Sequence, residues 1–319
     1  MPRSRRIKVK GESSFYHIIS RTVGQEFYLG DIEKENLVNI IKYYSGYYFV
    51  KVLGFCVMSN HFHLLIKSEP EGYYDDAEVY ERVKRYKKRD RESLSAYGLQ
   101  SYRAKMEDIS EYVRSIKQTF SVWYNRQNNR SGYFWGDRFK SVLIEDGETL
   151  LTCLAYIELN PLRAGLVKLP EEYRWSSFSY RLARGYRDNF LSFDGFFEKE
   201  EKPKREILSD YRYFVYKAGN IKSVSLADIE AGRELSEKPR ISDEIYDYEL
   251  KRQFTLPKSE LLLKRIRYFS DGLVIGSKGF IKEAYNRFGG EVIQKKDRKA
   301  YNTGLSKRIL SIRKLKVPL

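Results

Sequence analysis

Residues 48–67 read Tyr-Phe-Val-Lys-Val-Leu-Gly-Phe-Cys-Val-Met-Ser-Asn-His-Phe-His-Leu-Leu-Ile-Lys. Apolar and β-branched residues fill 48–58, Ser59-Asn60 is a turn signal, and 61–67 is apolar again, so this stretch predicts a β-hairpin. Successive side chains of a strand point to opposite faces of the sheet. His61 and His63 are therefore expected to project together from one face, with Phe62 on the other.

The sequence around the hairpin predicts further elements, read from hydrophobic spacing and from helix caps and stops. Asp31 is a candidate N-cap, and Asn160-Pro161 is a helix stop. The expected elements are a strand at 14–20, a helix at 31–45, helices at 77–92 and 107–127, a strand at 139–145 and a helix at 147–159. This order predicts an α+β fold of the ferredoxin-like type, an antiparallel sheet with helices on one face and the other face free for binding.

The chain is expected to divide into three parts. Residues 1–190 contain the predicted sheet, and the charged stretch 198–205 lies within a connector at 191–244. Residues 245–319 are predicted to be helical and basic. Their two amphipathic segments, 256–269 and 277–288, resemble a helix-turn-helix unit that would hold DNA, although a helical packing appendage would give the same pattern.

The composition indicates the class of partner and of compartment. The 319 residues include 59 Lys and Arg against 43 Asp and Glu, a net charge of +16, which favours a polyanionic partner over the alternative that the charge only maintains solubility. The sequence contains no run of about 18 apolar residues, so no membrane span is expected. Two cysteines exclude a disulfide scaffold and fit a reducing, bacterial-type cytosol.

Basic residues are concentrated in three segments, 3–10, 82–91 and 295–316, with tyrosines and phenylalanines scattered among them. Cations beside aromatic rings are how proteins hold single-stranded nucleic acid, although most of the tyrosines are expected to be packing residues. The candidate DNA contacts are Arg5, Arg6, Lys84, Arg85, Lys87, Lys88, Arg138, Lys140 and Arg163.

The histidine pair is a candidate metal site. Two imidazoles on one face of a strand are natural ligands of a divalent ion, whereas the alternative is a pair of ordinary sheet histidines. The sequence offers neither thiolates nor a third histidine nearby, which argues against a structural zinc site. Mg²⁺ or Mn²⁺, completed by a polar oxygen and by substrate phosphate, is the expected ion.

A second candidate element is the helix that ends at Asn160-Pro161. Thr152, Tyr156 and Asn160 follow one another at intervals of four and share a stripe, while Leu150, Leu154 and Ile157 form the apolar stripe. A tyrosine hydroxyl can attack phosphorus and hold a broken strand covalently. Alternatively, Tyr156 is a core residue and Asn-Pro is only a helix stop.

Five motifs occur in an order that resembles a known family. They are Phe15-Tyr16-His17, residues 57–65, Gly136-Asp137-Arg138-Phe139-Lys140, residues 156–167 and Trp175-Ser176-Ser177. Together they are similar to the REP-associated tyrosine transposases, a branch of the single-tyrosine HUH transposases, over about residues 5–185.

The resemblance implies an enzyme that recognises single-stranded DNA hairpins, cleaves beside them and transfers strands through a 5′-phosphotyrosine. It places His61 and His63 on the metal-binding pair, Tyr156 on the nucleophile and Asn160 on a third polar ligand that varies among relatives. His17 is either an accessory ligand for metal or phosphate or a buried structural histidine. The expected protein is cytoplasmic and nucleoid-associated, and it acts as a monomer or a homodimer.

Two departures from the family and two other functions stay open at this point. The basic segment 75–106 is longer than the family's connector, and the part after about residue 205 exceeds the compact catalytic domain. A domesticated hairpin-DNA-binding protein without transposition would keep the same motifs. A ferredoxin-like RNA-binding module or metal-dependent RNase is the third reading.

Overall fold

A computed structural model describes residues 8–9, 11–87, 95–184, 189–195, 204–222 and 238–255, with a few positions between 275 and 311. Its centre is a four-stranded antiparallel sheet in the order β2-β3-β1-β4. The strands are β1 (Ser14–Arg21), β2 (Val50–Val57), β3 (His61–Ser68) and β4 (Lys140–Ile144). Strand β1 thus lies between β3 and β4, as the ferredoxin-like arrangement requires. The predicted fold class is confirmed.

The predicted hairpin is formed by β2 and β3, which pair from Val50 opposite Ser68 to Val57 opposite Phe62. The helices follow the predicted order, as α1 (Asp31–Tyr47), α2 (Asp76–Lys87), α4 (Ile109–Gln127) and α5 (Glu148–Glu158). Between α2 and α4 lies a helix that was not predicted, α3 (Ala96–Met106). The N-cap of α1 is Gly30 rather than Asp31, which is the first residue of the helix.

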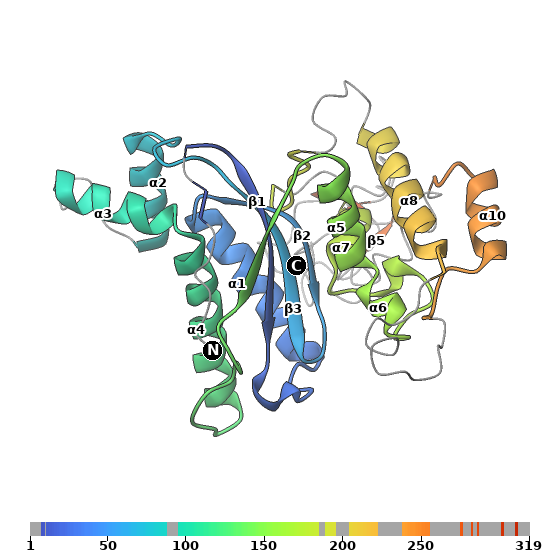
Figure 1. Cartoon of the computed structure of the whole chain (residues 1–319), viewed down its shortest axis with the longest axis horizontal. Coiled ribbons are helices and arrows are strands. Elements are labelled where there is room, and N and C mark those ends of the chain that lie inside the picture. Colours follow the sequence, from blue (N-terminus) through green and yellow to red (C-terminus); the bar gives the residue numbers. More distant parts are fainter. Residues whose placement is uncertain are drawn as a thin grey trace.

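One face of the sheet packs against α1 and α4, which lie beside it in Figure 1. Even-numbered residues of β1 and β3 point into this layer because strand side chains alternate. The shared core includes Tyr16, Ile18, Phe62, Leu64 and Ile66 from the sheet and Leu37, Ile41, Val113, Ile116 and Phe120 from the two helices. Phe62 is fully buried here, so its histidine neighbours face the other side.

The opposite face is also partly covered, contrary to the prediction that helices would lie on one face only. Its core joins Phe15, Cys56 and Leu65 of the sheet to α5, α7 (Ser177–Arg184) and α8 (Lys204–Asn220). Gly54 makes the approach of α5 close, because a Cβ atom at this position would lie 2.2 Å from Leu154 Cδ1. The apolar stripe predicted on the helix, which contains Leu150, Leu154 and Ile157, accounts for this second layer.

The short elements after α5 continue around this second layer. They are α6 (Asn160–Arg163), the 3₁₀ turn η3 (Pro170–Glu172) and α10 (Asp243–Lys251). Within α8, Tyr211, Val215 and Tyr216 are fully buried against α5 and its neighbours. The described part of the predicted connector therefore belongs to the same packed core as α5, while the division at residue 190 stays a prediction.

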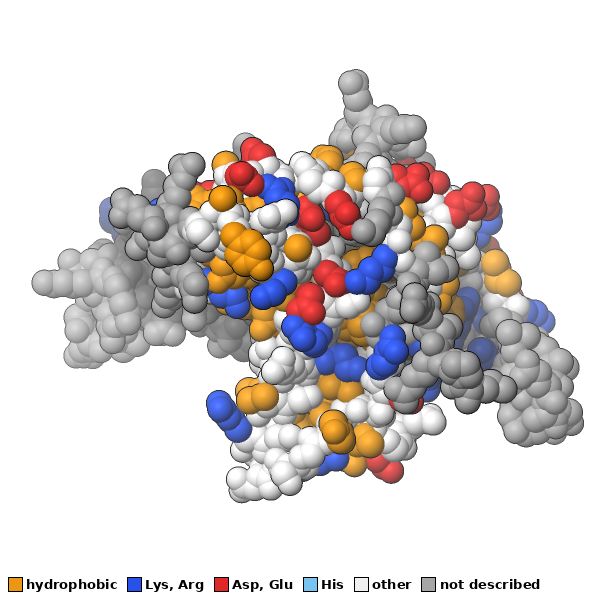
Figure 2. Space-filling model, turned by 60° about the vertical axis from the view of Figure 1, so that its left-hand side comes forward, with side chains coloured by type: hydrophobic (Ala, Val, Ile, Leu, Met, Phe, Trp, Pro, Cys, Tyr) orange, Lys and Arg blue, Asp and Glu red, His pale blue; other side chains and the backbone are white. Residues whose placement is uncertain are grey.

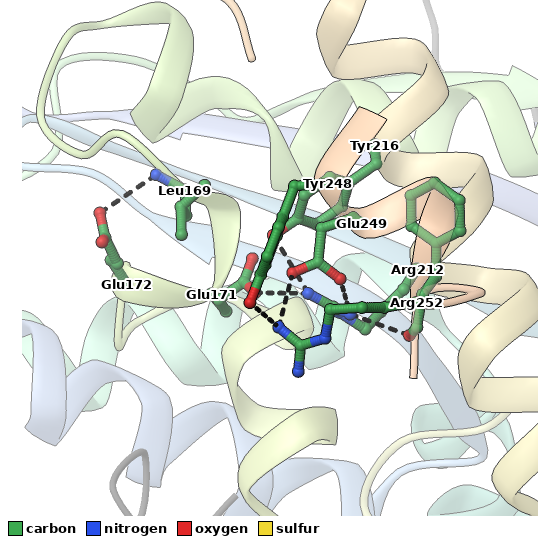
Figure 3. A network of polar contacts seen from close by, with 9 residues as sticks. Leu169, Glu171, Glu172, Arg212, Tyr216, Tyr248, Glu249 and Arg252 are labelled. Atoms are coloured by element: carbon green, nitrogen blue, oxygen red, sulfur yellow. Dashed lines mark hydrogen bonds and ion pairs between the residues drawn. The ribbon is translucent and has the colours of Figure 1, made fainter. Parts of the chain in front are cut away.

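A buried ionic network fixes α8 and α10 to η3 (Figure 3). Arg212 of α8 lies 2.9 Å from a carboxylate oxygen of Glu171 and 2.9 Å from one of Glu249. It also donates to the carbonyl of Phe254 and to the hydroxyl of Tyr216. Because a buried charge is tolerated only with such partners, this network holds the three elements in one arrangement.

The region 245–319 was predicted to be helical, but it also contains short strands. Ile275–Gly276 (β5), Tyr301–Asn302 (β6) and Leu310–Ser311 (β7) form a small antiparallel sheet in the order β5-β7-β6. The predicted helices at 256–269 and 277–288 lie largely outside the described residues, so the helix-turn-helix interpretation stays a prediction.

Candidate functional site

The two histidines of the predicted metal site start β3. His63 is buried and His61 is partly buried. Arg21 of β1 lies opposite His61 in the register, and Ile19 lies opposite His63. Cross-strand partners share a face, so the histidine pair and the odd-numbered residues of β1 lie on the α5 side of the sheet. The predicted projection of both histidines from one face agrees with this register.

Each imidazole has a defined polar neighbour. Nε2 of His17 lies 2.9 Å from Nδ1 of His63, with the two rings stacked and their centroids 5.1 Å apart. Nδ1 of His61 lies 2.6 Å from Oδ1 of Asn60. His17, one strand away on β1, is therefore a buried neighbour of the pair, and its predicted part in binding metal or phosphate stays a prediction.

All three histidines are held in the neutral form. Burial lowers the pKa of His17 to about 4 and, together with the positive charge of Arg21, that of His61 to about 4. Burial, the two other imidazoles and Arg21 lower the pKa of His63 to about 2. A neutral imidazole carries a lone pair, so at neutral pH the site presents nitrogen ligands that do not first have to lose a proton.

Tyr156 projects from α5 against this histidine cluster. Its ring centroid lies 6.0 Å from that of His17 and 6.0 Å from that of His63, in edge-on contact with both. The side chain is nevertheless 44% exposed, so it is not the core residue of the alternative reading. The apolar stripe of α5 faces the sheet core while Tyr156 lies beside the histidines, which leaves its phenol accessible.

Asn160 is one helical turn beyond Tyr156, at the start of α6. Its amide nitrogen donates to the carbonyl of Tyr156 at 2.9 Å and to that of Ile157 at 3.3 Å. These bonds satisfy carbonyls at the end of α5 and leave Oδ1 as the only side-chain atom for a cation. The predicted role of Asn160 as a metal ligand stays a prediction.

Several cations lie near the histidines. Lys140 of β4 is exposed and pairs with Ile19 of β1, which in turn pairs with His63 of β3. Lys140 therefore lies on the same face of the sheet as His63, two strands and roughly 10 Å away. Arg138 precedes it at the same end of the sheet. Burial lowers the pKa of Arg163 from its ordinary value, whereas the adjacent Tyr156 raises it. Arg21 was missed by the sequence reasoning, although its position at the end of the strand of His17 was a signal.

The other predicted DNA contacts lie elsewhere. Lys84, Arg85 and Lys87 belong to α2, which packs near the start of β2, at the end of the sheet away from the histidines. Figure 2, which turns the side with α2 to α4 toward the reader, shows Lys and Arg side chains interspersed with Asp and Glu. Arg5, Arg6 and Lys88 lie outside the described residues.

The site fits a divalent ion held by two imidazoles. Nε2 of His63 is buried and has no hydrogen-bond partner among the described residues. A bound cation would satisfy this nitrogen. Within that same part of the chain, no group of three His, Cys, Asp or Glu residues could hold a metal. The remaining ligands would therefore be oxygens of an amide, water or substrate, which fits Mg²⁺ or Mn²⁺.

Among the described helices, none is long and apolar enough to cross a membrane.

Comparisons with known proteins relate the first part of the chain to a transposase family. Residues 11–95 match the family model described as transposase IS200-like. A search of curated proteins finds no match. A solved structure, described as the REP-associated tyrosine transposase bound to a REP hairpin, is similar at 20% identity over 64% of this chain and 99% of that chain, with a TM-score of 0.40.

The matched residues contain β1, α1, β2, β3 and α2, and therefore the whole histidine cluster, whereas Tyr156 lies beyond them. The family-model match thus agrees, over residues 11–95, with the resemblance to transposases drawn from the sequence motifs.

Proposed function

We propose that the protein is a metal-dependent transposase that cleaves single-stranded DNA beside a hairpin and transfers the strand through Tyr156. The observation that carries this proposal is the position of Tyr156, whose exposed phenol lies in edge-on contact with His17 and His63. A tyrosine in a neutral imidazole cluster is suited to attack on a phosphate that the same cluster positions.

The reaction proposed for this site is a transesterification. The phenol oxygen of Tyr156 forms a bond to phosphorus as the bond from phosphorus to the 3′ oxygen breaks, and the phenol proton is released while the 3′ oxygen gains one. The product is a 5′-phosphotyrosine and a free 3′-hydroxyl. Attack by the 3′-hydroxyl of another strand reverses these changes and releases Tyr156. Mg²⁺ or Mn²⁺ at His61 and His63 would polarise the scissile phosphate.

Cations at the same end of the sheet support a DNA substrate. Arg21 lies opposite His61 on the exposed rim, and Lys140 is on the same face, so both flank the position of a phosphate bound near the histidines. The basic residues of α2 lie at the other end of β2 and β3. For eight-residue strands this is a separation of roughly 25 Å, enough for one substrate to contact both ends through its stem.

The proposal is tested with DNA hairpins that carry a single-stranded flank and a label at either the 5′ or the 3′ end. Incubation with Mn²⁺ or Mg²⁺ is expected to give a protein adduct with the 3′-labelled product and a free 5′-labelled fragment. Tyr156→Phe is expected to abolish both, while Tyr97→Phe, which changes an exposed tyrosine of α3, is expected to retain them.

Two outcomes would contradict the proposal. Hairpin binding without cleavage in any divalent metal would identify a DNA-binding protein that does not transpose. Preferential cleavage of an RNA hairpin of the same sequence would identify a ribonuclease.

A further inference from the structure

We infer that Asn60 and His17 are positioning residues, which fix the tautomers of His61 and His63 so that both present an unprotonated Nε2 to one cation. This inference rests on the proposed function for the identity of the metal. In a neutral imidazole one nitrogen carries the proton and the other the lone pair, and the hydrogen bond of the first determines which is which.

For His61 the tautomer follows from a chain of two hydrogen bonds. The amide nitrogen of Asn60 donates to the carbonyl of Gln25 at 2.9 Å, and a carbonyl only accepts. The amide oxygen of Asn60 is therefore the atom that lies 2.6 Å from Nδ1 of His61. An amide oxygen also only accepts, so Nδ1 of His61 carries the proton and Nε2 carries the lone pair.

The position of Asn60 is itself fixed by its backbone. The carbonyl of Asn60 accepts from the backbone nitrogen of Thr22 at 2.9 Å, and that of Ser59 accepts from Leu29 at 2.9 Å. Gln25 adopts a left-handed conformation, with φ of 61°, that is uncommon for a residue other than glycine. The loop after β1 thus holds the turn before His61 in one geometry.

For His63 the corresponding acceptor is His17. The 2.9 Å contact joins Nε2 of His17 to Nδ1 of His63, and one of the two atoms donates. Nε2 of His63 is buried without a partner among the described residues, so a proton on that nitrogen would be an unsatisfied donor. A lone pair on that nitrogen is unsatisfied only until a cation binds it, so the tautomer that suits the site has the proton on Nδ1 of His63, donated to His17, and the lone pair on Nε2.

In both predicted ligands a protonated Nδ1 donates to a neighbouring acceptor, which is an amide oxygen for His61 and an imidazole nitrogen for His63. Such outer partners orient a ligand ring before the metal arrives, and their loss lowers metal affinity about 10–100-fold. A site with only two protein imidazoles depends on this orientation more than a site with a full set of protein ligands.

The tautomers are measured by nitrogen-15 NMR of the full chain, metal-free and without DNA, labelled on histidine. The chain has only three histidines, so single variants assign every signal. The expected result is a protonated Nδ1 and an unprotonated Nε2 for both His61 and His63. A protonated Nε2 on either residue would overturn the inference. Because neither metal nor DNA is present, this result is independent of whether the protein cleaves DNA.

Variants then connect the tautomers to metal binding, measured as the Mn²⁺ dissociation constant by electron paramagnetic resonance. Asn60→Ala is expected to weaken binding about 10–100-fold and to change only the His61 signals. His17→Phe keeps a ring stacked on His63 but removes the acceptor, and it is expected to weaken binding similarly while changing the His63 signals.

A conservative variant and a matched control separate orientation from folding. Asn60→Asp keeps an acceptor toward His61 and is expected to stay within a few-fold of the unmodified protein. Asn128→Ala removes another amide that donates to a backbone carbonyl, at the end of α4, and is expected to leave Mn²⁺ affinity unchanged. Equal losses in Asn60→Asp and Asn60→Ala, or an unchanged affinity in both Asn60→Ala and His17→Phe, would refute the positioning roles.

Discussion

Replacing Arg212 with alanine tests whether the buried network of Figure 3 holds α8 and α10 onto η3. The side chains of Arg212 and Glu171 are each 1% exposed, and that of Glu249 is 9% exposed. Removing the guanidinium takes the Arg212 partner away from both buried carboxylates, of which Glu249 keeps Arg252 at 3.7 Å. Breaking a buried ion pair in this way costs about 3–5 kcal/mol, because the remaining charge keeps its desolvation penalty.

The loss is measured by urea unfolding, followed by circular dichroism at constant pH. With a slope of about 2–3 kcal/mol per molar urea, a loss of about 4 kcal/mol lowers the midpoint by about 1.5 M. Arg114→Ala is the matched control, because Arg114 is 67% exposed in its pair with Glu111. Removing that exposed pair is expected to cost no more than about 1 kcal/mol.

A triple variant separates charge burial from packing. Arg212→Met with Glu171→Gln and Glu249→Gln removes the charges while keeping similar volumes, and it is expected to recover most of the lost stability. Equal midpoints for Arg212→Ala and Arg114→Ala would refute the reasoning, since the cost would then not depend on burial.

Two further predictions concern pH. Burial raises the pKa of Glu158 to about 7 despite its bonds from Ser177 and Tyr211, so the folded state binds more protons than the unfolded state between pH 4.5 and 7 and loses stability as pH rises through that window. Glu158→Gln removes this loss of stability. In thermal unfolding, the variant should be more stable than the unmodified protein above pH 7, and the difference should vanish below pH 4.5. A stability gain independent of pH would contradict the assignment. Burial lowers the pKa of His17 to about 4, so the unfolded state binds more protons between pH 6.5 and 4 and stability falls as pH falls. In metal-free protein, His17→Phe should therefore gain about 2 kcal/mol relative to the unmodified chain between pH 7 and pH 5. A constant difference would show instead that the pKa of His17 is the same in the folded and unfolded states.

The sheet and the histidine pair were predictable because their signals are local. The turn Ser59-Asn60 between two apolar runs determines the hairpin, and strand alternation determines that His61 and His63 share a face while Phe62 enters the core. The apolar stripe of α5 likewise predicted a packing helix, although the stripe alone did not reveal that this helix covers the second face of the sheet.

The parts that were not predicted depend on contacts between distant segments. Arg21 ends the strand that contains His17, but the register that places Arg21 opposite His61 could not be read from the sequence. Asn60 was read as a turn residue, because its bond to the carbonyl of Gln25 depends on a loop 35 residues earlier. The buried partners of Arg212 come from η3 and α10, which are distant in the sequence. The sequence around Arg212 therefore does not distinguish it from an arginine on the exposed face of a helix.

The central claim is that Tyr156 is the residue that becomes joined to DNA. Mass spectrometry of the proteolysed adduct, formed with a hairpin substrate and Mn²⁺, tests it directly. The expected result is a nucleotide on the phenol oxygen of the peptide that contains Tyr156, unchanged by Tyr133→Phe, which alters a tyrosine that is 87% exposed. Attachment to any other residue, or an adduct that persists in Tyr156→Phe, would contradict the account.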